Sequence, residues 1–112
     1  RLRQVFLNLL DNAFKYAREG DRVVISLART ADGIACAVCD TGPGIPPEHL
    51  PHVTRRFYRV APQQGSGSGL GLALAAEILR RHNTALELES RVTGETGTCA
   101  RFVLPLVEVE AR

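Results

Sequence analysis

The sequence predicts a single α/β domain in which helices accompany a β-sheet. Two segments carry apolar residues at helical spacing, residues 2–17 and 70–82. Four shorter segments have the alternation or the β-branched composition of strands: 22–29, 34–40, 85–89 and 99–109. A length of 112 residues suits one domain, and no apolar run is long enough to cross a bilayer. The net charge of +2 gives no argument for a nucleic-acid or membrane partner, and no signal-peptide pattern is present.

The first helix, residues 2–17, has an apolar face and a polar stripe. Asn8 and Asn12 lie one turn apart, and Lys15 continues the same stripe. A solvated helix face is the ordinary explanation of such residues. However, asparagine is a poor helix former, and amide oxygens beside an ammonium group suit a metal–phosphate ligand. No capping residue precedes this helix, which suggests that upstream chain is missing.

Strands 22–29 and 34–40 are joined at Ala31-Asp32-Gly33, which predicts a hairpin. The second strand runs into Asp40-Thr41-Gly42-Pro43-Gly44-Ile45. An acid followed by a glycine turn at a strand's carboxyl end is a frequent ligand position, although the same residues also make ordinary turns.

The next segment is predicted to begin with a short helix at Pro46-Pro47-Glu48. Residues 53–60 interleave arginines with Phe57 and Tyr58, and residues 61–68 have the composition of a mobile loop.

The glycine-rich stretch Gly65 to Gly71 passes directly into the second long helix. Glycines let the backbone approach a ligand, and the first-turn N–H groups and the helix dipole favour an anion. The alternative is a flexible linker before a core helix. Asn83 is expected to cap the helix in the left-handed conformation.

Three cysteines are present, two of them in a C-x-x-C pattern within a predicted strand. Cys36 and Cys39 would then point to opposite faces of the sheet, which disfavours a metal or disulfide shared between them. We expect all three, Cys99 included, to be small buried thiols in a reducing compartment.

Four motifs in this order resemble the catalytic and ATP-binding domain of sensor histidine kinases, in the GHKL ATPase superfamily. Residues 8–16 (NLLDNAFKY) match the asparagine box, 40–45 (DTGPGI) the first glycine box, and 67–73 (GSGLGLA) the second. RRFYRV resembles the phenylalanine box. The resemblance implies a Bergerat fold: a two-layer sandwich with a mixed, mostly antiparallel sheet on about three helices, here without the family's first strands.

The family resemblance assigns the adenine end of the site to the first glycine box. Asp40 would accept a hydrogen bond from the adenine amino group. Gly42 and Gly44 would let backbone and water approach the purine, and Ile45 would lie on its apolar side.

The resemblance also assigns residues to the metal- and phosphate-binding end of the site, where ATP and Mg²⁺ would be the cofactors. Asn12 would bind Mg²⁺ through its side-chain oxygen, supported by Asn8, and Lys15 and Tyr16 would lie along the phosphates and ribose. Arg59 would reach the triphosphate. The second glycine box would present backbone N–H groups to the phosphates, from Gly69, Leu70, Gly71 and Leu72. Phe57 would anchor the lid.

Several positions depart from the family pattern. Thr54 and Arg55 stand where the phenylalanine box usually begins with an aromatic and an acid. Cys99 stands about where a hydroxyl residue often helps at the adenine end. The expected effect is on lid packing and ATP affinity rather than on the fold.

By this resemblance, the chain would donate the γ-phosphoryl group of Mg·ATP to a histidine on separate dimerisation helices of the same protein. The parent would be a cytoplasm-facing homodimer, in some cases an inner-membrane sensor, that serves a response regulator. His49, His52 and His82 lack the context of an acceptor. We therefore expect this piece to be monomeric and to bind ATP without autophosphorylating.

Three alternatives remain at this stage. A degenerate kinase would keep the fold without binding nucleotide. A hydrolytic GHKL ATPase would place a glutamate where Asn8 stands. A non-enzymatic module could bind single-stranded nucleic acid through the arginines and aromatics of residues 55–59.

Overall fold

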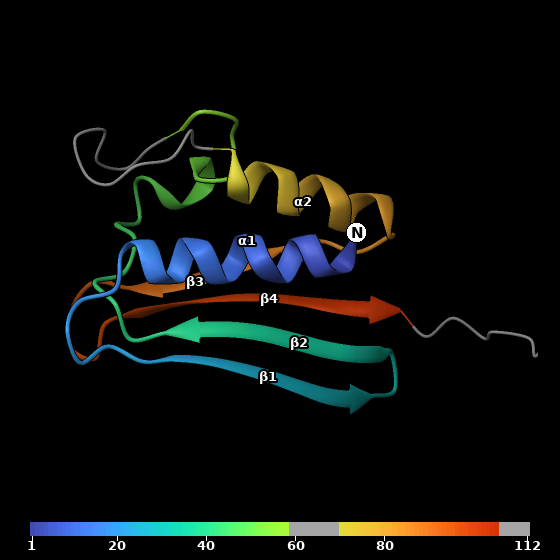
Figure 1. Ribbon diagram of the computed structural model, residues 1–112, viewed down its shortest axis with the longest axis horizontal. Coiled ribbons are helices and arrows are strands. Elements are labelled where there is room, and N and C mark those ends of the chain that lie inside the picture. The colour runs from blue at the N-terminus through green and yellow to red at the C-terminus, as the bar shows by residue number, and fades with distance from the viewer. Residues whose placement is uncertain (59–69, 106–112) are drawn as a thin grey trace, which may run out of the picture.

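The computed structural model describes residues 1–58 and 70–105. Two helices lie side by side on one face of a four-stranded sheet, which makes two layers (Figure 1). The elements follow in the order α1 (Leu2–Lys15), β1 (Val23–Thr30), β2 (Gly33–Asp40), a 3₁₀ turn (Leu50–His52), α2 (Gly71–Arg81), β3 (Glu87–Arg91) and β4 (Gly97–Pro105). The predicted α/β class is confirmed. Among the helices described, none is long and apolar enough to cross a membrane.

The sheet has the strand order β1-β2-β4-β3, and each neighbouring pair of described strands is antiparallel. β1 and β2 form the predicted hairpin, with Thr30 opposite Gly33. β4 returns between β2 and β3, so that Asp40 pairs with Thr98 and Ser90 pairs with the same residue from the other side. Three segments far apart in the sequence therefore meet at one end of the sheet.

The core lies between the helices and the inner face of the sheet. Alternation along each strand places Val38 of β2 and Phe102 of β4 on this face, where both are buried. α1 contributes Val5 and α2 contributes Leu79, neither with any exposed surface. Apolar contact across this layer supplies most of the driving force for folding, since burial of apolar surface stabilises by roughly 25 cal/mol per Å².

α2 ends as the sequence predicts. Asn83 has φ 62°, and its N–H donates to the Arg80 carbonyl oxygen while the Thr84 N–H donates to the Leu79 carbonyl oxygen. These two bonds make a Schellman motif, which satisfies carbonyl groups left free by the helix end. Asparagine tolerates the left-handed conformation better than most residues, so Asn83 terminates the helix at little cost.

The expectation for the cysteines was partly wrong. Cys36 is a buried free thiol on the inner face, but Cys39 and Cys99 form a disulfide between β2 and β4. The two residues are 60 positions apart and become opposite neighbours only through the β2–β4 register. The expected opposite orientation of Cys36 and Cys39 is consistent with this arrangement. The last strand is described to Pro105, so its predicted continuation to residue 109 lies outside the described residues.

Candidate functional site

A narrow pocket opens where the inner face of the sheet meets the C-terminal half of α1 and the start of α2. Every layer of the fold contributes to its wall: Leu9, Asn12, Ala13, Val38, Asp40, Ile45, Leu72, Leu88, Thr98 and Ala100. The wall is mostly apolar, with a few polar groups that converge from different elements. This composition is typical of small-molecule sites.

Asp40 supplies the pocket's carboxylate at the end of β2. One carboxylate oxygen, Oδ1, accepts from the Gly42 backbone N–H at 2.9 Å, which closes the turn that the sequence predicts. Burial raises the pKa of the Asp40 carboxyl above its ordinary value, and the negative charge of Asp21 adds to this rise. The backbone amides of Gly42 and Thr98 act in the opposite direction on the same pKa.

The hydroxyl group of Ser90 holds the other side of the pocket together. It accepts from the Ile45 backbone N–H at 2.7 Å and lies 3.0 Å from the Gly97 carbonyl oxygen and 2.7 Å from the Thr98 hydroxyl. Because a carbonyl oxygen can only accept, the Ser90 hydrogen goes to Gly97, and Thr98 donates to Ser90. The Thr98 oxygen then faces the pocket with acceptor capacity only, like Asp40.

Two glycines bring the backbone segments of the site into close contact. At Gly44 (φ +83°) an added Cβ would lie 2.0 Å from the Arg91 carbonyl oxygen. At Gly97 (φ +153°) it would lie 2.2 Å from the Asp40 carbonyl oxygen. Both distances exclude any side chain, and both φ values lie in the region that favours glycine. The loop after β2 can therefore pack on β3 and β4 only with glycine at these positions.

The polar stripe of α1 is divided between the pocket and the helix pair. Asn12 lines the pocket. Asn8 instead donates from Nδ2 to the Gly71 carbonyl oxygen at 3.2 Å, while its Oδ1 accepts from Gln4 at 2.7 Å. Asn8 thus ties α1 to the first residue of α2. Lys15 at the helix end places its Nζ 5.5 Å from the centroid of the Tyr16 ring.

α2 begins at Gly71, the last residue of the glycine-rich stretch, as predicted. No side chain at the N-cap residue, Leu70, bonds the first-turn N–H groups, and Leu72 reaches the pocket. The helix start is therefore next to the pocket, and the backbone N–H groups of a helix start can bind an anion. Arg59 and Gly69 lie outside the described residues.

The turn after α1 is hydrogen-bonded to the loop that follows Asp40, a contact that the sequence did not predict. The Arg18 guanidinium donates hydrogen bonds to the Asp21 carboxylate, and its Nη2 also donates to the Thr41 carbonyl oxygen at 2.9 Å. The side-chain and backbone hydrogen bonds from Arg18 hold the pKa of the Asp21 carboxyl below its ordinary value. An arginine three residues before an aspartate signals a local pair, but the contact with Thr41 needs the fold.

Phe57, the expected lid anchor, comes just before the segment 59–69, which lies outside the described residues. Phe57 is 66% exposed and has φ 67°. Tyr58 contacts the described chain here, with its hydroxyl 2.5 Å from Nδ1 of His49.

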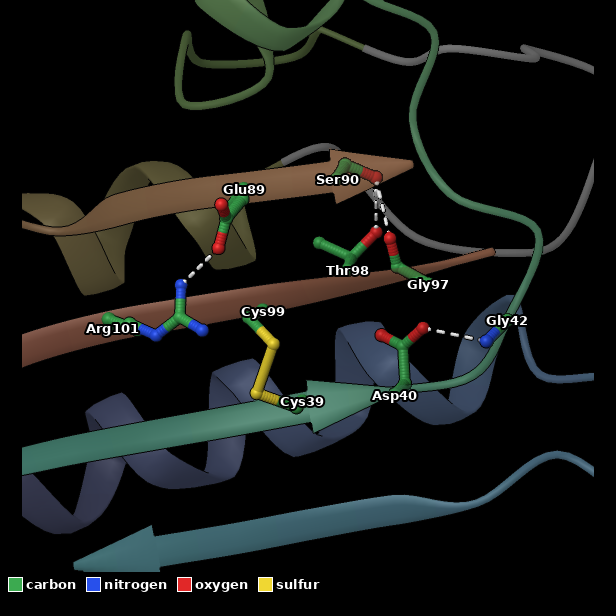
Figure 2. The surroundings of a disulfide bond; sticks show 9 residues. All are labelled: Cys39, Asp40, Gly42, Glu89, Ser90, Gly97, Thr98, Cys99 and Arg101. Atoms are coloured by element: carbon green, nitrogen blue, oxygen red, sulfur yellow. Dashed lines mark hydrogen bonds and ion pairs between the residues drawn. A yellow bond between two sulfur atoms is a disulfide. The ribbon is translucent and has the colours of Figure 1, made fainter. Parts of the chain in front are cut away.

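The expectation for Cys99 was also wrong. Strand alternation puts Thr98, not Cys99, on the pocket side of β4, and Cys99 faces outward in the disulfide (Figure 2). The hydroxyl expected at this position is therefore present one residue earlier. Of the predicted site residues, the pocket brings together Asn12, Asp40, Ile45 and Leu72. It adds Thr98, which alternation with the buried Ala100 could have identified.

An acidic strand end, a glycine loop and a helix start thus meet at one pocket, and the comparison with protein families gives an ATPase family for this combination. The sequence model of the histidine kinase-, DNA gyrase B- and HSP90-like ATPases matches residues 1–108. The chain belongs to this ATPase family. Its curated relatives include the adaptive-response sensory kinase SasA of Crocosphaera subtropica, 43% identical over 107 residues, which is 94% of this chain and 28% of that protein. The sensor histidine kinase Hik2 of Thermosynechococcus vestitus is 41% identical over 93% of this chain and 28% of its own length. The chain thus spans about a quarter of these kinases.

Solved structures agree with the fold of this ATPase-family domain. A mycobacterial sensor histidine kinase, MprB, superposes with a TM-score of 0.82 at 37% identity, over 91% of this chain and 70% of that chain. The catalytic domain of the histidine kinase ThkA gives 0.78 at 27% identity, over 93% and 66% of the two chains. The structural neighbours are therefore histidine kinase catalytic domains.

Proposed function

We propose that this domain binds Mg·ATP in the pocket and donates the γ-phosphoryl group to a histidine on a separate dimerisation domain of the same protein. The observation that carries the proposal is the convergence of Asp40, Thr98 and Asn12 on one pocket beside the start of α2. The family match and the kinase relatives support the same reaction.

The polar groups of the pocket suit adenine at one end. Asp40 offers a carboxylate oxygen, and Thr98 offers oxygen lone pairs because its hydrogen is used on Ser90. Two acceptors match the exocyclic amino group of adenine, which is a donor, and do not match the carbonyl oxygen that guanine carries at that position. Ile45 and Leu88 add apolar surface for the purine ring.

The other end of the pocket suits phosphate and magnesium. Asn12 presents a side-chain amide, whose oxygen is a hard ligand of the kind that Mg²⁺ prefers, and Mg²⁺ commonly takes its other ligands from phosphates and water. Lys15 lies one turn further along α1 than Asn12, and α2 begins at Gly71, next to the pocket residue Leu72. Bound Mg²⁺ would neutralise phosphate charge, while the chain's own groups position the triphosphate.

Asn8 would support the site rather than bind the ligand directly. Its amide bonds Gln4 and Gly71, so it fixes the start of α2 relative to Asn12. An amide has no basic group with which to activate water, unlike the glutamate of hydrolytic relatives in the superfamily. We therefore propose phosphoryl transfer rather than hydrolysis.

The further proposals concern the parent protein. Its partners would be the acceptor-histidine helices and a response regulator, with no nucleic acid involved, and the parent would be a homodimer. We place the domain in the cytoplasm, where ATP is available, whether or not the parent is anchored in a membrane.

The decisive test is calorimetric titration of the domain with ATP, with and without Mg²⁺. Saturable binding is expected, with loss in Asp40→Ala and loss of the magnesium dependence in Asn12→Ala. Asp11→Ala is the matched control, because Asp11 is an exposed acid on α1 that does not line the pocket. No binding by folded wild-type domain would reject the proposal in favour of a degenerate kinase.

Radiolabelled ATP separates transfer from the other outcomes. The domain alone is expected to acquire no phosphate and to release little, whereas added acceptor helices should be labelled. Steady hydrolysis would instead identify a hydrolytic ATPase. Oligonucleotide binding that ATP does not displace would support a nucleic-acid module.

A further inference from the structure

The disulfide lies directly behind the proposed nucleotide site. Cys39 and Cys99 occupy opposite positions on β2 and β4, with their Cα atoms 4.0 Å apart. The next pair along the same two strands is Asp40 opposite Thr98, and both of these residues line the pocket. Alternation puts the two pairs on opposite faces, and Figure 2 shows the disulfide next to Asp40 and Thr98 along the two strands.

This position is the end of the β2–β4 ladder. The register of the two strands stops at Asp40 and Thr98, after which β2 leads into the glycine loop and Gly97 pairs with β3. Terminal pairs of a ladder open most readily. A covalent link at the penultimate pair therefore limits how far Asp40 and Thr98 can separate.

The pair is accessible to thiol chemistry, in contrast to the third cysteine. Cys39 and Cys99 are each partly exposed on the outer face, and within the described ranges the helices lie on the other face only (Figure 1). Cys36 is buried on the inner face, and burial raises the pKa of its thiol, which makes it unreactive. Exchange at Cys39 and Cys99 thus has no competing thiol nearby on the same face.

We propose that Cys39 and Cys99 are a redox modification site that tunes nucleotide affinity from the back of the sheet. The inference rests on the proposed function, both for the nucleotide and for the reducing compartment. In such a compartment, protein disulfides are generally transient or redox-sensing rather than structural.

The reaction is thiol–disulfide exchange with a low-molecular-weight disulfide such as oxidised glutathione. One cysteine thiolate attacks the disulfide and releases one thiol, and the second cysteine then attacks the mixed disulfide and releases the other. The two cysteines lose two electrons and two protons in total, and the small disulfide becomes two thiols. Reduction is the reverse reaction with excess thiol.

The oxidised form is expected to bind nucleotide more tightly, because the link holds Asp40 and Thr98 in place before the ligand arrives. We expect a roughly fivefold difference, at the low end of typical couplings between sites. Linkage requires the reverse effect as well. Nucleotide must favour the disulfide by the same factor, which corresponds to a shift of about 20 mV in its reduction potential.

The test titrates ADP into the whole chain in two states, reduced with excess dithiol and oxidised with glutathione disulfide. Peptide mass mapping verifies the Cys39–Cys99 link in the oxidised sample. Weaker binding after reduction is the expected result. Equal affinity in both states would overturn the inference and leave the nucleotide site intact, whereas no binding in either state would overturn the proposed function and the inference with it.

Two variants control the experiment. Cys39→Ser/Cys99→Ser should show one affinity under both conditions, close to that of the reduced wild type. Cys36→Ala keeps the pair and should retain the full response. A second readout needs no turnover: the glutathione ratio at half-oxidation should shift when ADP saturates the protein. An unchanged ratio would contradict the coupling.

Discussion

Replacement of Ser90 by alanine tests the hydrogen-bond network that supports the pocket. The Ser90 hydroxyl joins the Ile45 amide, the Gly97 carbonyl and the Thr98 hydroxyl. Each such bond contributes about 1 kcal/mol net, and partly buried partners left unpaired cost more than exposed ones. Because these residues are only partly buried, water can replace some of the bonds. We expect Ser90→Ala to lower the free energy of unfolding by about 2 kcal/mol.

A double-mutant cycle in urea unfolding measures the shared bond. Thr98→Val removes one bond and should cost about 1 kcal/mol, while the double variant should cost little more than Ser90→Ala alone. Thr98→Ser keeps the hydroxyl and should stay close to wild type. Ser26→Ala, at an exposed position on β1, is the matched control and should change stability by less than about 0.5 kcal/mol.

If Ser90→Ala costs no more than the Ser26→Ala control, or if the two substitutions at Ser90 and Thr98 are simply additive, the network does not hold the site together. ADP titration of the same variants adds a second criterion. Thr98→Val should weaken binding beyond its effect on stability, because it removes a pocket acceptor.

Three further predictions concern the surroundings of the site. The raised pKa of Asp40 means that its carboxyl protonates at higher pH than that of an ordinary aspartate. The ATP affinity measured by calorimetry should therefore fall on mild acidification. An affinity that stays constant down to about pH 4 would contradict the role of Asp40. Because the pKa of Asp21 is lower in the folded protein, its carboxylate stabilises the fold at pH values above the ordinary aspartate pKa, and this stabilisation is lost as the pH falls through the pKa of the folded protein. Arg18→Ala should therefore lower the midpoint of urea unfolding at about pH 7, and lower it less in acid. At the end of α2, Asn83→Ala should lower the melting temperature, whereas Asn83→Gly should not, because glycine adopts a positive φ without strain. Equal effects of the two substitutions would show that the left-handed conformation of Asn83 does not matter for stability.

Much of this fold follows from local sequence. The helical period of residues 2–17 and 70–82 predicted α1 and α2 to within two residues at each end, and Asn83 predicted the cap. The hairpin followed from the turn at 31–33. These elements are readable because propensity and periodicity act over a few neighbouring residues.

The ends of other elements were less predictable. The strand expected at 85–89 runs from Glu87 to Arg91, and the helix expected from Pro46 is a 3₁₀ turn at Leu50–His52. The first difference follows from pairing with β4, which selects the residues that reach its ladder. Pairing with a distant strand overrides weak local preference.

The sequence by itself determined the family and the residues that approach the pocket from single motifs: Asp40, Asn12, Ile45 and Leu72. Only the tertiary structure decided how distant segments meet. It made Cys39 and Cys99 partners, turned Thr98 rather than Cys99 to the pocket, and joined Ser90 to the loop after β2. The physical reason is that a strand's side chains alternate with a period of two. A shift of one residue in register would exchange the two faces, and the register is set by pairing across the whole sheet.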